Sequence, residues 1–241
     1  MSTFVRREDH GSVRLLVLDR PEARNALHGP MRAELIAALQ EAESETNVTA
    51  VVLTGAGTAF SAGVDFKIHD HPPAIEAQRL LNPASAVRAM RTPVIGAVNG
   101  ACVSGGLEIA LSCTVLIAGS SARFADTHAR LGVVATWGLT ALLPRAVGVR
   151  QASRMSLTGE YVGAEEALRI GLVAAVVPDD ELRARSLSVA TQIVGNAAAA
   201  EVADLYRQGE NLGLVDALEL EKATSLTRSV DLESFSRQAR S

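Results

Sequence analysis

Residues 99–108 read Asn-Gly-Ala-Cys-Val-Ser-Gly-Gly-Leu-Glu, and this stretch decides how the chain is organised. It belongs to a longer run, between Arg91 and Arg123, in which Glu108 is the only charged side chain. An ionised carboxylate in apolar surroundings is costly unless it is paired, or unless it takes up a proton and serves as a general acid. The Gly105-Gly106 pair opens an apolar helical pattern, where backbone N–H groups can approach a ligand and a helix N-terminus favours negative charge. The stretch therefore predicts an acid–base group beside an oxyanion site.

Short apolar runs rich in β-branched residues lie on both sides of this stretch. They occupy residues 13–18, 51–55, 94–100 and 115–119, and the last three are closed by glycine. Such runs are typical of buried strands. Helical patterns separate them, at residues 30–44, 86–90 and 105–113. Strands that alternate with helices predict an α/β fold, and the threefold return of a strand–turn–helix unit favours a stacked spiral of such units.

The second half of the chain is mainly helical in pattern, with a short apolar strand predicted at residues 172–177. We predict a boundary near residue 186, which separates a core of residues 1–185 from a helical region of residues 186–241. Residues 214–226 of that region have helical spacing with a polar reverse face. A helical segment of this size buries little surface alone, so we expect it to pack on another subunit or to fold back over the core.

The composition favours a small-molecule ligand. The 241 residues are 48% hydrophobic, enough for a substantial core, and carry a net charge of −4 without a Lys/Arg cluster. This argues against nucleic acid or an anionic membrane surface as the main partner. Polar residues interrupt residues 92–122 too often for a membrane span, and no basic segment precedes an apolar N-terminal one. Cys102 and Cys113 are interpreted as buried thiols rather than a disulfide, as expected in a reducing cytoplasm.

Residues 67–84 are rich in proline and are predicted to form a mobile loop near the site. They contain His69-Asp70-His71, Pro72-Pro73 and Asn82-Pro83. Two histidines around an aspartate suggest a metal, but no third ligand is evident, so a solvated loop is favoured over a metal site.

Four motifs follow one another along the chain. They are residues 20–27 (Arg-Pro-Glu-Ala-Arg-Asn-Ala-Leu), residues 60–66 (Phe-Ser-Ala-Gly-Val-Asp-Phe), residues 99–108, and the stretch 122–145, which includes Ala-Arg-Phe at its start and Leu-Pro-Arg at its end. Any one of them alone is weak, because glycine-rich turns after strands are common. Together, and in this order, they closely resemble the enoyl-CoA hydratase/isomerase family, also called the crotonase family. The resemblance extends over roughly residues 13–180.

The resemblance implies a crotonase-like spiral of ββα units with a C-terminal helical region that assembles a homotrimer or a dimer of trimers. It implies an acyl-CoA thioester as ligand, with no metal and no redox cofactor. In such enzymes two backbone N–H groups, here those of Val64 and Gly105, hold the thioester oxygen and stabilise the enolate. Losing one such donor typically lowers the rate about 100- to 1000-fold. A plain tight turn is the alternative interpretation of Gly63 and Gly105.

The resemblance also implies which residues surround the CoA and acyl groups. They are Ala23, Arg24, Ala26, Ala62, Asp65, Phe66 and Gly106, with Arg24 near a phosphate. Asp65 is equally compatible with a cap of the following turn, and a phenylalanine such as Phe66 is more often a core residue than a ligand contact.

Glu108 matches the first of the family's two catalytic glutamates, which position a water for addition to a 2-enoyl chain. The position of the second glutamate falls on His128, so Glu108 and His128 are the predicted catalytic pair. Imidazole titrates near neutrality and can relay a proton. The alternative is that His128 starts a helix and bonds to Asp126 without a chemical role. Trp137 either reshapes the acyl tunnel or packs at the hinge between core and tail.

The leading functional hypothesis is hydration of a 2-enoyl-CoA by a cytoplasmic enzyme. Isomerase, hydrolase and decarboxylase activities remain alternatives, because they share the oxyanion hole and differ in where protonable side chains stand. A second class is a non-catalytic acyl-CoA-binding protein. The histidine at position 128 motivates this second class, and the retention of Glu108 argues against it.

Overall fold

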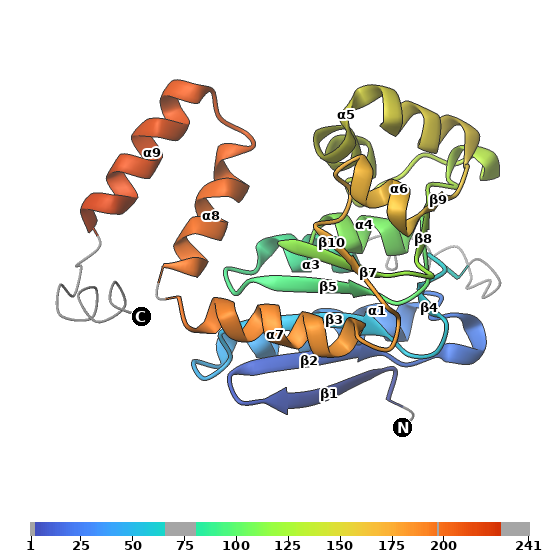
Figure 1. Cartoon of the computed structure of the whole chain (residues 1–241), viewed down its shortest axis with the longest axis horizontal. Helices are drawn as coiled ribbons and strands as arrows, with labels where there is room; N and C mark the ends of the chain where they lie inside the picture. The colour runs from blue at the N-terminus through green and yellow to red at the C-terminus, as the bar shows by residue number, and fades with distance from the viewer. Residues whose placement is uncertain (1–2, 66–80, 197, 228–241) are drawn as a thin grey trace. The chain divides into compact units, whose positions relative to one another are not determined.

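The computed structural model describes residues 3–65, 81–196 and 198–227 (Figure 1). The chain forms two compact units that divide after Asn196. The predicted boundary near residue 186 lies within one helix, α7 (Leu182–Val194). Because α7 packs along β3 and β5 of the large sheet, it belongs to the first unit, and the division follows its end.

The first unit contains two β-sheets. The larger has the order β1-β2-β3-β5-β7-β10, with β1 (Val5–His10), β2 (Val13–Leu18), β3 (Ala50–Gly55), β5 (Val94–Val98), β7 (Val115–Gly119) and β10 (Ala175–Val177). The smaller has the order β4-β6-β8-β9, with β4 (Ala59–Ser61), β6 (Ala101–Val103), β8 (Arg123–Ala125) and β9 (Val162–Gly163). Strands β1 and β2 pair antiparallel, as do β8 and β9, and the other pairs are parallel.

Three ββα units follow one another through these sheets. Strands β3 and β4 precede α3 (Pro83–Ala89), β5 and β6 precede α4 (Gly105–Leu111), and β7 and β8 precede α5 (Leu139–Thr158). In each unit the first strand joins the large sheet and the second joins the small one. Because successive units pair in parallel, the chain advances as a spiral, and the predicted fold class is confirmed.

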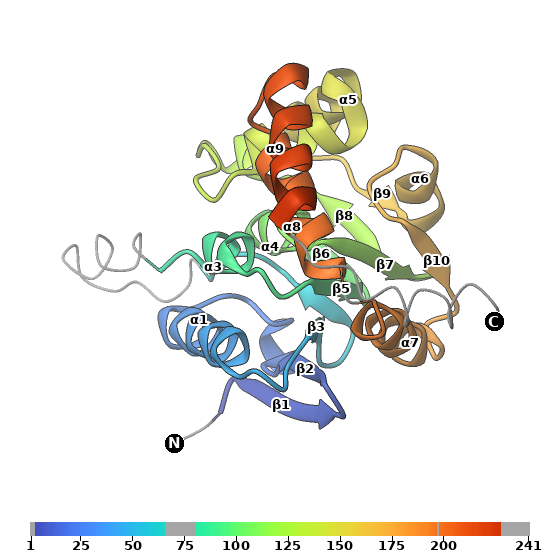
Figure 2. The same ribbon diagram turned by 90° about the vertical axis from the view of Figure 1, so that its left-hand side faces the viewer.

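The large sheet is covered on both faces. Along β2, Leu16 and Leu18 belong to the cluster that includes the buried face of α1 (Gly29–Ser44), whereas Leu15 and Val17 belong to the cluster that includes α7. Figure 2 shows α1 and α7 on opposite sides of β3. A strand buried on both faces is apolar at every position, which is why these strands could be predicted from continuous apolar runs.

The other elements fit the predictions with two differences. The predicted helix at residues 30–44 matches α1. The strand predicted at residues 172–177 is shorter in the structure, because the N–H groups of Leu172 and Val173 donate to the Ala167 carbonyl in the turn after α6 (Ala164–Arg169). Asn82-Pro83, predicted as loop, starts α3 instead, since the Asn82 side chain accepts a hydrogen bond from the Ser85 N–H at 2.9 Å.

The rest of the predicted loop, residues 67–80 with His69-Asp70-His71, lies outside the described residues. Within the described ranges no cluster of three His, Cys, Asp or Glu side chains suits a metal ion. Both Cys102 and Cys113 are free thiols, as predicted. None of the described helices is long and apolar enough to cross a membrane.

The second unit contains α8 (Ala199–Gly209) and α9 (Leu214–Thr227), which contact each other. The helix predicted at residues 214–226 matches α9. Neither helix buries a residue. Six of their large apolar side chains are exposed: Val202, Tyr206, Leu214, Val215, Leu218 and Leu226. Within residues 198–227, α8 and α9 therefore carry several exposed apolar side chains.

Candidate active site

The first part of the site is the turn between β6 and α4. Ser104 connects them with a positive φ (φ 46°, ψ −109°), a conformation that is costly for a residue other than glycine. Its N–H donates to the Ala125 carbonyl at 2.9 Å, and its hydroxyl accepts from the Thr127 N–H at 3.0 Å and pairs with the Thr127 hydroxyl at 2.7 Å. These bonds fix the start of α4 to the segment that carries residues 125–128.

The N–H groups of Val64 and Gly105 lie close together at this turn. A Cβ atom built on Gly105 would be 3.5 Å from the Val64 nitrogen, and one built on Gly63 would be 3.5 Å from the Gly105 nitrogen. No hydrogen bond within the described ranges uses either N–H. The structure thus brings together the two predicted donors and leaves both available, which a plain tight turn does not require.

Two of the sequence motifs lie side by side next to these donors. Leu27 and Val64 form an isolated parallel bridge, in which the Leu27 N–H donates to the Gly63 carbonyl at 2.7 Å. The Ala62 N–H donates to the Arg24 carbonyl at 2.9 Å. The motif at residues 20–27 therefore positions the Val64 amide.

Buried Asn25 holds this pair of segments together. Its side chain accepts from the Arg20 N–H at 2.9 Å and donates to the carbonyls of Ala56 at 2.9 Å and Ala59 at 2.7 Å. Its own carbonyl accepts from the Ser61 hydroxyl at 2.9 Å. Its backbone is left-handed (φ 54°), which asparagine tolerates better than most residues. Each buried backbone group left without a partner costs about 1–3 kcal/mol, so asparagine is well suited to this position.

The predicted CoA contacts are partly accessible on these segments. Ala23, Ala26 and Ala62 are partly exposed and Arg24 is exposed. Asp65, in contrast, has its carboxylate bonded to the Arg20 guanidinium at 2.6 Å, so it fixes the two segments to each other. Phe66 lies outside the described residues.

Gly106 has a packing role in the structure. A Cβ atom there would come within 2.6 Å of the Ser61 carbonyl oxygen, so only glycine lets α4 approach β4 this closely.

The second part of the site is the buried carboxyl of Glu108 on α4. Its Oε1 atom accepts from the backbone N–H groups of Trp137 at 2.6 Å and Leu139 at 3.3 Å, at the start of α5. Its Oε2 atom lies 3.7 Å from Nε2 of His128. The carboxyl therefore has one oxygen committed to the backbone and one directed at the imidazole.

His128 is buried between two carboxyl groups. Its Nδ1 atom lies 2.6 Å from Oδ1 of Asp126, and its backbone N–H donates to the same oxygen at 3.1 Å. It also precedes the short helix η2 (Ala129–Leu131). His128 thus starts a helix and bonds to Asp126, as the structural alternative requires. It also lies next to Glu108, as the predicted catalytic pair requires.

The electrostatics favour protonation of this pair. Burial raises the pKa of Glu108, and the bond from the Trp137 N–H and the charge of His128 oppose this only in part. Burial disfavours a charged His128, but the hydrogen bond and charge of Asp126, with the charge of Glu108, outweigh it and raise the pKa of His128. Because the groups are close, the two ionisations belong to the pair.

Trp137 lies against the oxyanion turn. A Cβ atom on Gly105 would be 3.1 Å from Cζ3 of its indole, and the Arg32 guanidinium lies over the ring, 5.5 Å from its centroid. The Trp137 carbonyl accepts from Arg88 at 2.8 Å. Trp137 therefore packs against the oxyanion turn, and its role in shaping an acyl tunnel stays a prediction.

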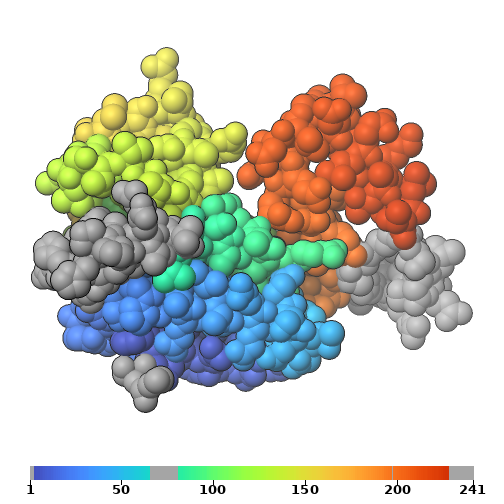
Figure 3. Space-filling model, turned by 180° about the vertical axis from the view of Figure 1, so that it is seen from behind, coloured from blue at the N-terminus to red at the C-terminus, as the bar shows by residue number. Residues whose placement is uncertain are grey.

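Sequence reasoning did not identify Arg32 and Arg88. Both are substantially buried, and burial lowers the pKa of each. The available signal was Arg32 beside Met31 on the apolar face of α1, where a cation is unusual. Helix α3 carries Arg88. Figure 3, which views the molecule from the opposite side, shows the surface of α3 between the surface of α1 and the surface of the segment that leads into α5.

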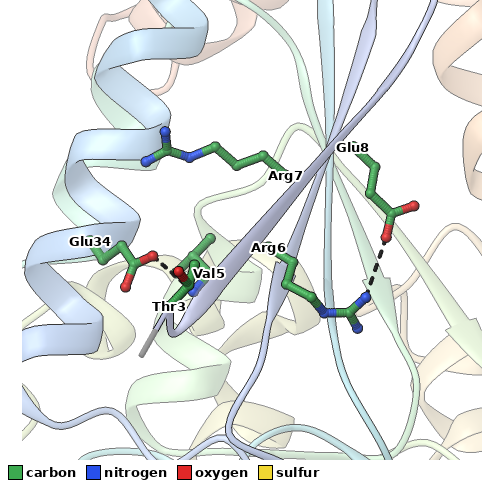
Figure 4. A pocket seen from close by; sticks show the side chains of 6 residues that line it. All are labelled: Thr3, Val5, Arg6, Arg7, Glu8 and Glu34. Atoms are coloured by element: carbon green, nitrogen blue, oxygen red, sulfur yellow. Dashed lines mark hydrogen bonds and ion pairs between the residues drawn. The ribbon is translucent and has the colours of Figure 1, made fainter. Parts of the chain in front are cut away.

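A separate surface hollow of about 610 Å³ lies beside β1, away from these residues (Figure 4). Its charged groups are already satisfied. Arg6 pairs with Asp19, Arg7 pairs with Glu41, and Glu34 accepts from the Phe4 and Val5 N–H groups. The hollow therefore lacks the chemistry of the turn at Gly105.

Known proteins resemble the chain over most of its length. A family model described as enoyl-CoA hydratase/isomerase matches residues 8–233. The short-chain-enoyl-CoA hydratase of Clostridium acetobutylicum is 38% identical over 212 residues, covering 86% of this chain and 80% of that protein. The crystal structure of an enoyl-CoA hydratase from Bacillus anthracis matches with a TM-score of 0.93 at 29% identity, covering 98% of this chain and 96% of that one. That of Mycobacterium tuberculosis H37Rv matches with a TM-score of 0.77 at 42% identity, covering 92% and 98%.

Proposed function

The chain belongs to the enoyl-CoA hydratase/isomerase family, and from this premise we propose that it adds water across the double bond of a 2-enoyl-CoA. One observation carries the proposal. The unused N–H groups of Val64 and Gly105 lie at the turn that begins α4, and Glu108 on the same helix faces His128 at 3.7 Å. Helix α4 therefore carries one oxyanion donor and one member of the proton-handling pair, and the segments after β4 and β8 place Val64 and His128 beside it.

In the proposed mechanism, the two N–H groups hold the thioester oxygen. They withdraw electron density from C3 and stabilise the enolate that forms when water adds there. Backbone donors suit this task because they need no reorganisation as the charge develops. The wall formed by Trp137 next to Gly105 limits the space for the acyl chain and helps to exclude bulk water.

Glu108 and His128 handle the protons. The water oxygen bonds to C3 and gives one proton to the pair, while the enolate collapses and C2 takes one proton from the pair. The pair ends with as many protons as it began, because it gives one and receives one. Since no electrons leave the substrate, the reaction requires no redox cofactor. The partly exposed Ala23, Ala26 and Ala62 are proposed to contact the CoA moiety, with Arg24 near a phosphate.

We expect the protein to hydrate crotonyl-CoA. The measurement is the loss of the enoyl thioester absorbance, with product identified by mass spectrometry as the substrate plus one water. Isomerised, hydrolysed or decarboxylated products from a panel of acyl-CoA thioesters, without hydration of any 2-enoyl-CoA, would contradict hydratase activity and indicate another reaction of the family.

A non-catalytic acyl-CoA-binding protein is the second candidate. The replacement of the second glutamate by His128 favours it. The burial of Glu108 argues against it, because a desolvated carboxyl has no use in binding a neutral acyl chain. Tight binding of several acyl-CoA thioesters without any turnover would support this candidate over the enzyme.

We also propose that the chain assembles as a homotrimer or as a dimer of trimers. The exposed apolar side chains of α8 and α9, such as Leu214, Val215 and Leu218, support this because such a surface is usually covered by a partner. Sedimentation equilibrium at micromolar concentration is expected to give three or six times the chain mass. A stable monomer would contradict the assembly. The cytoplasmic location stays a prediction.

A further inference from the structure

We propose that Asp126 is a positioning residue for the reaction, because it holds His128 with a proton on Nδ1 and thereby directs Nε2 at Glu108. This inference rests on the proposed function, in which Glu108 and His128 handle protons together. It assigns a role to a buried carboxyl that the water addition itself does not use.

The geometry leaves one arrangement of protons. Oδ1 of Asp126 lies 2.6 Å from Nδ1 of His128 and accepts from the His128 backbone N–H at 3.1 Å. Burial works to raise the pKa of Asp126, but the hydrogen bonds from the His128 ring and backbone outweigh it and hold the pKa below its usual value, so the carboxyl is ionised. An ionised carboxylate only accepts hydrogen bonds, so Nδ1 must carry a hydrogen. In the neutral imidazole, Nε2 then presents its lone pair to Glu108, 3.7 Å from Oε2.

The segment that carries Asp126 is anchored to the oxyanion turn. Ser104 bonds to Ala125 and Thr127, the residues on either side of Asp126. The imidazole therefore has a fixed place relative to the Gly105 N–H. The reaction needs this fixed spacing between the imidazole and the Gly105 N–H, because the proton relay must act on the same thioester that the N–H groups hold.

The charges around His128 come from three elements. Asp126 lies on the same segment, Glu108 faces the ring from α4, and Arg88 on α3 faces Glu108. Asp126 is the group that bonds to the Nδ1 side, where it favours the imidazolium. Removing its charge while keeping its shape should therefore make the pair lose its last proton at a lower pH.

The test is Asp126→Asn in the full-length protein. The Asn oxygen can still accept from the His128 ring and backbone, so the fold is expected to persist. We expect kcat to fall by at least roughly 10- to 100-fold, the loss typical when the hydrogen-bond partner of a metal-bound histidine is removed. KM for the enoyl-CoA should change little, and the alkaline limb of the kcat–pH profile should move to lower pH. Asp179→Asn is the matched control, because the Asp179 carboxylate also accepts a backbone N–H, that of Ser121 at 3.0 Å, and Asp179 is not among the groups that shift the pKa of Glu108 or His128.

Nitrogen-15 NMR of the histidine rings gives a readout that does not depend on activity, with His128→Ala assigning the signals. Above the pKa of the ring, the parent protein is expected to show neutral His128 with its proton on Nδ1, and Asp126→Asn is expected to lower the pKa of that ring. A parent whose neutral His128 carries its proton on Nε2, or a variant with the parental kcat–pH profile, would overturn the inference. If the ring behaves as expected but no acyl-CoA is turned over, the proposed function fails while the positioning of His128 by Asp126 remains.

Discussion

Glu108→Gln is expected to lower kcat for the best enoyl-CoA substrate by about 100- to 10,000-fold, the usual contribution of a positioned acid–base group. Glutamine is a close match in shape. Its amide oxygen can accept from the N–H groups of Trp137 and Leu139 as Oε1 does now, so the start of α5 should stay in place. The other end of the side chain then presents an N–H₂ group to His128, and it can no longer receive the proton that water releases.

His128→Ala tests whether the imidazole belongs to the same proton-handling unit. We expect a loss of similar size, and the double variant should be little worse than the poorer single variant, because groups that act as a unit are not additive. If His128→Ala keeps near-parental turnover while Glu108→Gln abolishes it, His128 is structural and Glu108 acts alone with water. Circular dichroism of all three variants controls for loss of the fold.

The pH dependence follows from the same pair. The proposed mechanism needs one proton on the pair, so activity falls when the pair gains a second proton at low pH or loses its last one at high pH. Burial raises the pKa of Glu108, and Asp126 raises that of His128. The bell-shaped profile is therefore expected to have its alkaline limb above the ordinary histidine pKa of about 6.5.

The sequence predicted the central strands of the large sheet, β2, β3, β5 and β7, because they are buried on both faces, whereas β1 was not predicted because most of its side chains are polar and exposed. Strands such as β2 and β7 are apolar at nearly every position and coincide with the predicted runs. The small sheet was not recognised, because β4, β6, β8 and β9 are two or three residues long and show no period. Their pairing depends on distant segments that only the folded spiral brings together.

The site was predictable to the extent that its chemistry is local in sequence. Glycines beside a lone carboxyl identified the turn at Gly105 and Glu108, whereas His128 was identified from the resemblance to the family, and the structure places its imidazole next to Glu108. The positions of Arg32 and Arg88 could not be predicted, because both come from helices α1 and α3 that reach the site through tertiary packing. The bond of Asp65 to Arg20 likewise joins residues far apart in the chain.

Gly105→Val is expected to abolish acyl-CoA binding and turnover together. A Cβ atom at this position would lie 3.2 Å from Cγ2 of Val64 and 3.1 Å from the Trp137 indole, and 3.5 Å from the Val64 nitrogen. The valine side chain would therefore occupy the space in front of the two N–H groups, where the thioester oxygen is proposed to bind. Loss of one oxyanion donor alone costs about 100- to 1000-fold in rate, and this change obstructs both.

The measurement is calorimetry with a non-reactive acyl-CoA analogue, followed by turnover of crotonyl-CoA. Gly163→Val is the matched control, because Gly163 is exposed, has an extended backbone and has open space where its Cβ would lie. The control should bind like the parent, whereas Gly105→Val should show no heat of binding at high micromolar ligand. If the parent shows no binding either, or if Gly105→Val binds and turns over like the parent, the N–H groups of Val64 and Gly105 do not hold the thioester. In that case both the enzyme and the carrier proposals lose their structural basis, because each requires the acyl group to dock at this turn.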